Sequence, residues 1–265
     1  MPSSIKLKAE LGDDINILFV ESQGTSPDDT EAFIYRQKWG GSQALWTHER
    51  PCESGLDGIP AFVLLGNDGR VLTSGYSGDG KVKDLIAAEL KAAKAVPKDL
   101  PPALAKSWQE FVKGSYGAAI LGAQKVAELP AADDKAGAAE RAKTLVADWT
   151  QRATNRVERV KYLIDNAYFA KADSEVLALK VAVKGLPDLE SKLADFATRL
   201  AGEEFKAARE AAKSLDNLLG KVNEKGVEDK TGKELKKLAE KYSGTKPGER
   251  AARLSRLLEK KPAQG

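Results

Sequence analysis

The sequence predicts an α/β domain in roughly the first third of the chain, followed by an all-α domain of helical hairpins. Before residue 96, apolar runs typical of strands alternate with amphipathic helical patterns. Beyond Pro102, every segment has helical periodicity, with breaks at glycine or proline. Three prolines fall between residues 97 and 102 and predict a linker there. We therefore expect domains at 1–96 and 103–265, joined by the proline-rich linker 97–102.

The first expected elements are a helix, a strand and a second helix. Residues 5–12 have the pattern of the last turns of a helix that stops at a glycine. The run 15–20 is nearly all apolar, which predicts a strand covered on both faces by helices. Ser26, followed by a proline and two acidic residues, predicts a capped helix that runs to about Trp39 and ends at Gly40-Gly41.

A short strand, a hairpin and a helix complete the first domain. Residues 43–47 predict the short strand. Between residues 58 and 75, an apolar run, an Asn-Asp-Gly turn and a second β-rich run form the pattern of a β-hairpin. Residues 81–95 then predict a helix with one apolar face, made of Val82, Leu85, Ile86 and Leu90.

The rest of the chain predicts helices joined by short turns. This alternation is typical of packed helical hairpins, an α-solenoid or a tetratricopeptide-like arrangement, although the repeat is degenerate and has no fixed period. The expected helices are 103–112, 116–129, 133–169, 174–183, 189–200, 204–223, 233–242 and 249–260.

The first domain resembles the thioredoxin-like superfamily, most closely its redoxin and thiol–disulfide reductase members. The resemblance covers about residues 5–95 and rests on the order of elements and on the run from Pro60 through the Asn-Asp-Gly turn to Leu72. It implies that Pro60 is the cis-proline of the fold, and that Ile59 and Pro60 line a groove for peptide substrates. The helical part resembles, more weakly, the helical extensions of thioredoxin-like proteins in some bacteria.

Two departures from this family bear on function. Its members carry a Cys-x-x-Cys pair facing the cis-proline and a central first strand ahead of the cysteine helix, and this sequence has neither. A sheet without that strand would leave backbone groups unpaired and apolar surface uncovered. Three explanations stay open, of which we favour the first: an N-terminally incomplete sequence, a strand donated by another chain, or a rearranged sheet. As written, the sequence predicts a soluble cytoplasmic protein, and an incomplete start would admit an exported, periplasmic one.

Cys52 is the candidate catalytic residue because it is the only cysteine in the sequence. Arg50 and His48 would lower the pKa of its thiol, whereas Glu49 and Glu53 would oppose that change. One cysteine and one histidine are too few for a zinc site, so we expect no metal. The sequence contains no glycine motif for nucleotide phosphates, and we expect no cofactor.

These observations favour a thioredoxin-fold binding or scaffold protein without a dithiol site in this chain, whose helical domain binds protein or peptide partners. The alternative is a thiol–disulfide oxidoreductase or peroxidase-like protein that acts in cell redox homeostasis. Its active cysteines would lie upstream of this chain, or it would use Cys52. We hold the chain to be an enzyme only under that alternative, and we predict no oligomeric state.

Charge and hydropathy limit the classes of partner that the sequence predicts. The net charge is +3, and no apolar run is long enough to span a bilayer. From Glu203 onward, 16 Lys or Arg stand against 11 Asp or Glu, with few aromatic residues, which argues against binding of single-stranded nucleic acid. Because Lys and Arg are in excess in this part of the chain, a third hypothesis is that this basic tail docks on an acidic surface.

Overall fold

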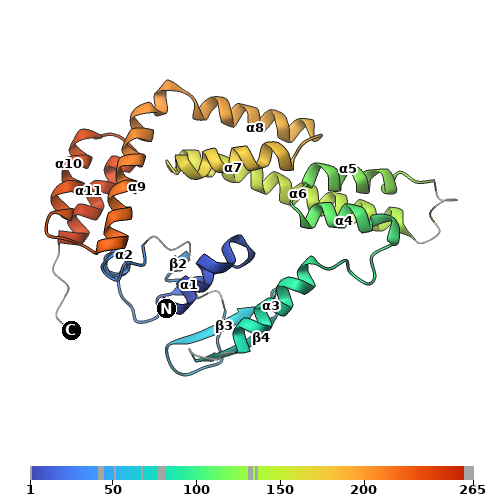
Figure 1. Cartoon of the computed structure of the whole chain (residues 1–265), viewed down its shortest axis with the longest axis horizontal. Coiled ribbons are helices and arrows are strands. Elements are labelled where there is room, and N and C mark those ends of the chain that lie inside the picture. Colours follow the sequence, from blue (N-terminus) through green and yellow to red (C-terminus); the bar gives the residue numbers. More distant parts are fainter. Residues whose placement is uncertain are drawn as a thin grey trace. The chain divides into compact units, whose positions relative to one another are not determined.

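The computed structural model describes residues 2–40, 45–50, 52–66, 68–76, 81–130, 134 and 137–259. The chain divides into two compact units. Unit 1 comprises Met1–Ala95 with Val222–Val227, and unit 2 comprises Val96–Lys221 with Glu228–Gly265. Most of the described residues are helical, and the described strands all belong to unit 1 (Figure 1).

The helices of unit 1 begin and end largely through local hydrogen bonds. Helix α1 (Pro2–Leu11) stops before Gly12, whose φ is +53°, so the predicted glycine stop is confirmed. Helix α2 (Pro27–Arg36) begins at Ser26, whose Oγ accepts a hydrogen bond from the Asp29 amide at 3.1 Å. The third helix, α3 (Lys81–Lys94), matches the predicted range and buries Ile86.

The predicted end of α2 at Gly40-Gly41 is wrong. The helix closes with a Schellman motif in which Lys38 has φ +62°. The Lys38 amide donates to the Tyr35 carbonyl oxygen (3.0 Å), and the Trp39 amide donates to the Ile34 carbonyl oxygen (2.9 Å). A left-handed lysine costs about 1–2 kcal/mol. Directly after this lysine, the Trp39 ring packs against the rings of Phe33 and Trp46.

Unit 1 contains two separate two-stranded sheets. Strand β1 (Leu18–Val20) pairs in parallel with β2 (Leu45–Thr47), and β3 (Ala61–Leu65) pairs antiparallel with β4 (Val71–Tyr76). Residues 43 and 44 of the predicted second strand lie outside the described residues. Within the described part of the chain no strand joins the two pairs, so the single sheet that the sequence suggests is not present.

The prediction that the first strand is covered on both faces is wrong. Only Leu18–Val20 of the expected 15–20 is in strand conformation, and Leu18 is 41% exposed. The expectation assumed a central position in a larger sheet. In the described residues β1 has a single strand neighbour, so the central position that would bury both faces is not formed.

The predicted hairpin is confirmed. The Gly66 amide donates to the Arg70 carbonyl oxygen (2.8 Å), and the Gly69 amide donates to the Gly66 carbonyl oxygen (3.0 Å). Gly69 has φ +81°, a conformation that glycine adopts without strain. The register shifts by a bulge between Leu64 and Leu65. Asn67 of the predicted turn lies outside the described residues.

Unit 2 confirms the prediction of a helical domain. Consecutive helices from α4 to α8 pack side by side, α6 also contacts α8, and α10 packs on α11 (Figure 1). The tetratricopeptide-like repeat stays a prediction. The helices are α4 (Ala105–Val112), α5 (Tyr116–Ala127), α6 (Ala138–Asp165), α7 (Phe169–Ala182), α8 (Pro187–Leu200), α9 (Lys206–Lys225, whose last residues fall in unit 1), α10 (Thr231–Lys241) and α11 (Lys246–Glu259).

The predicted long helix 133–169 is wrong at its end. Helix α6 stops at Asp165, and α7 begins at Phe169. Between them Ala167 has φ +59°, and the Tyr168 amide donates to the Leu163 carbonyl oxygen at 2.8 Å. The turn contains neither glycine nor proline, so composition does not reveal it. Burial of Phe169, which is 4% exposed, accompanies the change of direction.

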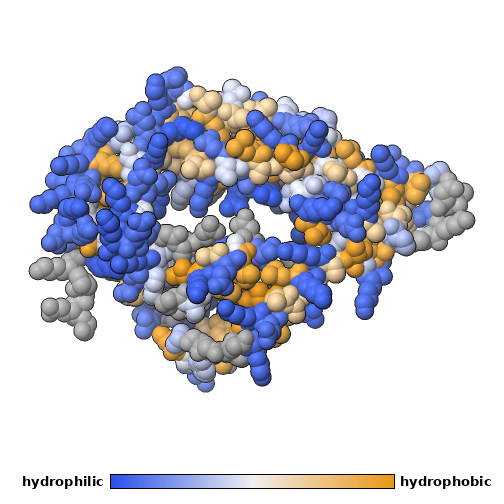
Figure 2. All heavy atoms as spheres, in the orientation of Figure 1, coloured by the Kyte–Doolittle hydropathy of each residue, from blue (hydrophilic) through white to orange (hydrophobic). Residues whose placement is uncertain are grey.

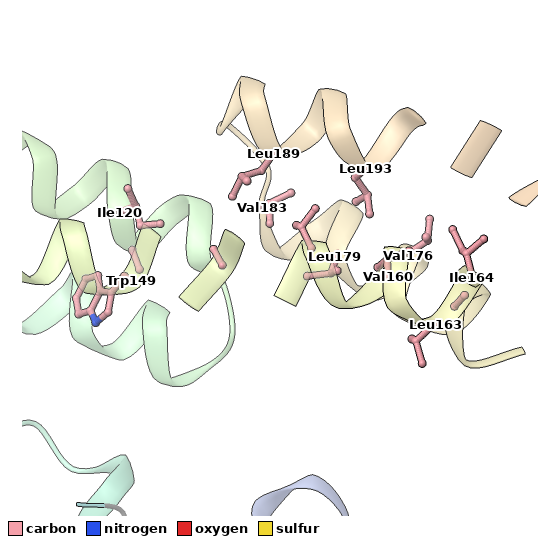
Figure 3. Packing of buried hydrophobic residues seen from close by; sticks show 14 of the residues in the cluster. Ile120, Trp149, Val160, Leu163, Ile164, Val176, Leu179, Val183, Leu189 and Leu193 are labelled. Atoms are coloured by element: carbon pink, nitrogen blue, oxygen red, sulfur yellow. The ribbon is translucent and has the colours of Figure 1, made fainter. Parts of the chain in front are cut away.

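The hydrophobic core of unit 2 runs along one face of α6. Its buried residues recur every three or four positions at Ala142, Leu145, Trp149, Ala153, Val157, Val160 and Ile164. Trp149 stacks on Phe111, with ring centroids 4.7 Å apart. Toward the other end of α6, side chains from α6, α7 and α8, including Val160, Val176 and Leu193, converge (Figure 3). This core therefore joins α4 to α8 through side-chain packing.

Candidate functional site

The peptide bond between Ile59 and Pro60 is cis, as the resemblance implies. Both residues are exposed directly ahead of β3, and 61% of Ile59 is accessible. Gly58 packs closely against the Tyr76 side chain, because a Cβ at this position would lie 3.2 Å from the ring. Tyr76 is itself 52% exposed. The start of the hairpin therefore presents a small apolar surface made of Ile59, Pro60 and Tyr76.

Strand β3 has an open edge beside this surface. Its one strand partner among the described residues is β4. Because backbone groups alternate between the two edges of a strand, about half of the amide and carbonyl groups of β3 are directed away from β4. The strand is Ala-Phe-Val-Leu-Leu, and none of these five residues is fully buried. An apolar strand edge without a charge to protect it favours pairing with a further strand.

The β1–β2 pair also leaves apolar side chains exposed. Phe19 lies opposite Trp46, with ring centroids 4.6 Å apart. Trp39 stacks nearly parallel to Trp46 at 6.2 Å and meets the edge of Phe33 at 5.6 Å. These four rings tie β1 and β2 to the end of α2, which is a packing role. Leu18 and Leu45, at the start of each strand, stay largely exposed. Apolar side chains thus remain uncovered on both sheets.

Cys52 is a free and exposed cysteine. In the described part of the chain it has no hydrogen bond or ion pair with His48 or Arg50. Instead, His48 Nδ1 lies 3.6 Å from Glu21 Oε2. The pKa of Glu21 is lowered mainly by the hydrogen bond that its carboxylate accepts from the Gln23 amide, and the charge of His48 adds to the effect. In the part of this loop that the structure describes, no base or orienting group is bonded to the thiol.

Two features were sought among the described residues, a cluster of metal-binding side chains and a membrane-spanning helix. The described residues contain no group of three or more His, Cys, Asp or Glu side chains that could hold a metal ion. A search of the same residues for a helix long and apolar enough to cross a lipid bilayer finds none.

Sequence reasoning missed a second surface, on α7. This helix buries one face in the core of unit 2 and also exposes Leu177 (67%) and Val181 (78%). The signal was available in the sequence, because apolar residues surround α7 instead of following a single stripe. The predicted helices 133–169 and 174–183 left residues 170–173 outside both, so Ala170 was not placed on the same helix as Leu177 and Val181.

Comparisons with known proteins assign neither surface a role. No protein-family model matches the chain, and no curated protein or solved structure matches it at a significant level.

Proposed function

We propose that this chain is a binding or scaffold protein without dithiol chemistry of its own. Its first unit, which we interpret as thioredoxin-like, binds an extended polypeptide segment along β3, and its helical unit binds protein partners. The observation that carries the proposal is the open apolar edge of β3 beside the exposed cis Ile59–Pro60. The resemblance supports it, because it implies a peptide groove at these two residues.

An added strand would stabilise β3 in two ways. It would pair the backbone groups of the open edge, and its alternate side chains would cover apolar residues such as Ile59 and Leu65. Each added hydrogen bond contributes about 0.5–1.5 kcal/mol net. Because β3 has only five residues, we expect affinities in roughly the micromolar range. Strand β4 is a poorer acceptor, since its sequence includes Gly75, and glycine is depleted in strands.

The lack of a partner for Cys52 supports binding over redox catalysis. A reactive thiol needs a nearby positive charge or base to stabilise the thiolate. Cys52 is exposed without such a contact in the described residues. Cys52→Ser is therefore expected to leave peptide binding unchanged. Reduction of insulin by the full chain, above the background of the reductant and lost in Cys52→Ser, would contradict the proposal and favour the redox alternative.

Fluorescence anisotropy with the full chain tests strand addition. The probe is a fluorescein-labelled peptide of alternating valine and threonine with a lysine at each end. We expect saturable binding that Ile59→Asp weakens about tenfold, because a charge at this edge opposes strand addition. Val71→Asp is the matched control, since Val71 is 56% exposed in the same hairpin but lies on β4.

Hydrogen exchange then locates the bound peptide. Amides of β3 that face its open edge should exchange more slowly when the peptide is bound, whereas those of unit 2 should not change. Absence of binding, or protection confined to unit 2, would overturn the proposed function of the first unit.

A further inference from the structure

Helix α7 exposes a stripe of mostly apolar residues, interrupted by Ser174, on the side away from the core. Ala170, Ser174, Leu177 and Val181 are all exposed and follow one another at intervals of four, three and four residues. We call these four residues the α7 seam. Figure 2 shows hydrophobic surface in the region of α7 and α8. A helix in contact with water on this side would be expected to carry polar residues there.

The spacing of the α7 seam is that of a helix which packs on another helix. Intervals of four and three residues place side chains on one narrow line, the arrangement of a and d positions in a coiled coil. The core residues of α7 lie on a different line, which includes Phe169, Ala172, Val176 and Leu179. The α7 seam is therefore additional to the packing that holds unit 2 together.

The charges beside the α7 seam are unbalanced. The two acidic residues of α7 are already paired: Asp173 with Arg209, and Glu175 with Arg156. The Asp173–Arg209 pair joins α7 to α9 (Nη2 to Oδ2, 2.6 Å), and the Glu175–Arg156 pair joins α7 to α6 (Nε to Oε1, 3.0 Å). Lys180, and Lys184 just beyond the helix, are exposed and have no ion-pair partner in the described part of the chain.

Lys171 adds to this positive border. It lies over the ring of Tyr168, 5.9 Å from the centroid, and it too has no carboxylate partner among the described residues. By its position in the sequence, Lys171 flanks the α7 seam on the side opposite to Lys180. A stripe of apolar residues bordered by lysines on both sides is complementary to a helix with an apolar stripe bordered by acidic residues.

We propose that the α7 seam docks an amphipathic α-helix of another protein, one whose apolar stripe is flanked by Glu or Asp. This deepens, and rests on, the proposed role of the helical unit in protein interaction. A second copy of α7 is a poorer occupant, because pairing two such seams would bring lysines together in either orientation. The acidic partner removes that repulsion and covers Leu177 and Val181.

Anisotropy with designed peptides and the full chain tests the docking. The probe is a labelled three-heptad helix with leucine and alanine at a and d and glutamate at e and g. A peptide with lysine at e and g is its control. We expect the glutamate peptide to bind at least about tenfold more tightly than the lysine peptide. Lys180→Glu should reduce the difference in affinity between the glutamate peptide and the lysine peptide.

Variants of the protein separate the α7 seam from other apolar surface. Leu177→Asp should weaken binding of the glutamate peptide about tenfold or more, because it places a buried charge in the centre of the docked face. Leu129→Asp is the matched control, since Leu129 is exposed near the end of α5 and outside the α7 seam. Far-UV circular dichroism should show the same helix content for both variants. A loss of binding can then not be explained by unfolding.

Several results would refute the proposed docking of an acidic helix on the α7 seam. Equal affinity for both peptides, or equal loss with Leu177→Asp and Leu129→Asp, would overturn it. So would a dimer, detected by sedimentation, that Leu177→Asp dissociates, because a second copy would then be the occupant. Binding of the valine–threonine peptide without the glutamate peptide would refute this inference and leave the function of the first unit standing. Binding of the glutamate peptide without the valine–threonine peptide would refute the proposed function of the first unit and leave this inference unaffected.

Discussion

Unit 2 buries many of its apolar residues in one continuous core, whereas most apolar residues of unit 1 are only partly buried or exposed. Between residues 1 and 95 the described residues contain four buried hydrophobic side chains, namely Ala32, Ile34, Tyr35 and Ile86. The continuous core of unit 2 extends from Leu100 to Ala212 and contains the fully buried Trp149. Both units have apolar sequences, so composition alone does not explain the difference.

The difference follows from the way each element satisfies its backbone. A helix pairs its own amide and carbonyl groups, so the helices of unit 2 need from their neighbours mainly side-chain packing. A strand pairs with other strands, and a lone two-stranded sheet is at best marginally stable. From this comparison we expect unit 2 to be the more tightly packed of the two units. Three changes to the protein test it, from the largest expected effect to the smallest.

Two tryptophan substitutions measure the contrast directly. Trp149→Ala should lower the free energy of unfolding of unit 2 by about 3–5 kcal/mol, because it leaves a cavity in a dry core. Trp46→Ala should cost less, about 1–2 kcal/mol, because Trp46 is only partly buried. Urea denaturation followed by circular dichroism and tryptophan fluorescence provides both values. Equal costs would mean that unit 1 is as tightly packed as unit 2.

Removal of a charge pair inside unit 2 should have a smaller effect. Arg156 makes two hydrogen bonds to Glu175 across the α6–α7 contact, which raise the pKa of its guanidinium. The pair is part-buried, so Arg156→Met should cost about 1–2 kcal/mol. Lys192→Met is the control, since the Lys192–Glu158 pair is exposed and worth about 0.5 kcal/mol or less. Urea denaturation of both variants compares them, and equal costs would remove any special role for the Arg156 pair.

The smallest effect is acid sensitivity at Asp165. A hydrogen bond from Lys161, and secondarily one from Arg199 of α8, lowers its pKa below the usual 3.8. A lowered folded-state pKa stabilises the fold above pH 3.8, and this contribution is lost as the pH falls through the folded value. Because the carboxylate is mostly solvated, the loss should be about 0.5 kcal/mol or less. Asp165→Asn should remove this part of the pH dependence in urea denaturation at pH 7 and pH 3. An unchanged profile would contradict the assignment.

Local signals in the sequence predicted many of these elements. Ser26 caps α2, Gly12 ends α1, and the Asn-Asp-Gly pattern gives the β3–β4 hairpin. Each depends on one or two residues acting on their own neighbourhood. Ile59 and Pro60 are exposed directly ahead of β3, and their role in a peptide groove stays a prediction.

The misplaced helix ends had no such local signal. Lys38 and Ala167 both take the left-handed conformation that composition assigns to glycine. In each case an aromatic residue follows, Trp39 or Phe169, and its packing against distant rings accompanies the turn. The α7 seam was missed for a related reason, because the face of a helix that stays exposed depends on which neighbours cover the other faces.

By itself, the sequence determined the type and approximate position of most helices and strands, the turn of the hairpin, and the presence of a single cysteine, Cys52. Only the tertiary structure decided that the strands form two open pairs, that His48 lies against Glu21 and not Cys52, and that Leu177 and Val181 face outward. Secondary structure depends mostly on contacts within a few residues, whereas exposure depends on contacts between segments far apart in the chain. A binding surface is made of what those long-range contacts leave uncovered.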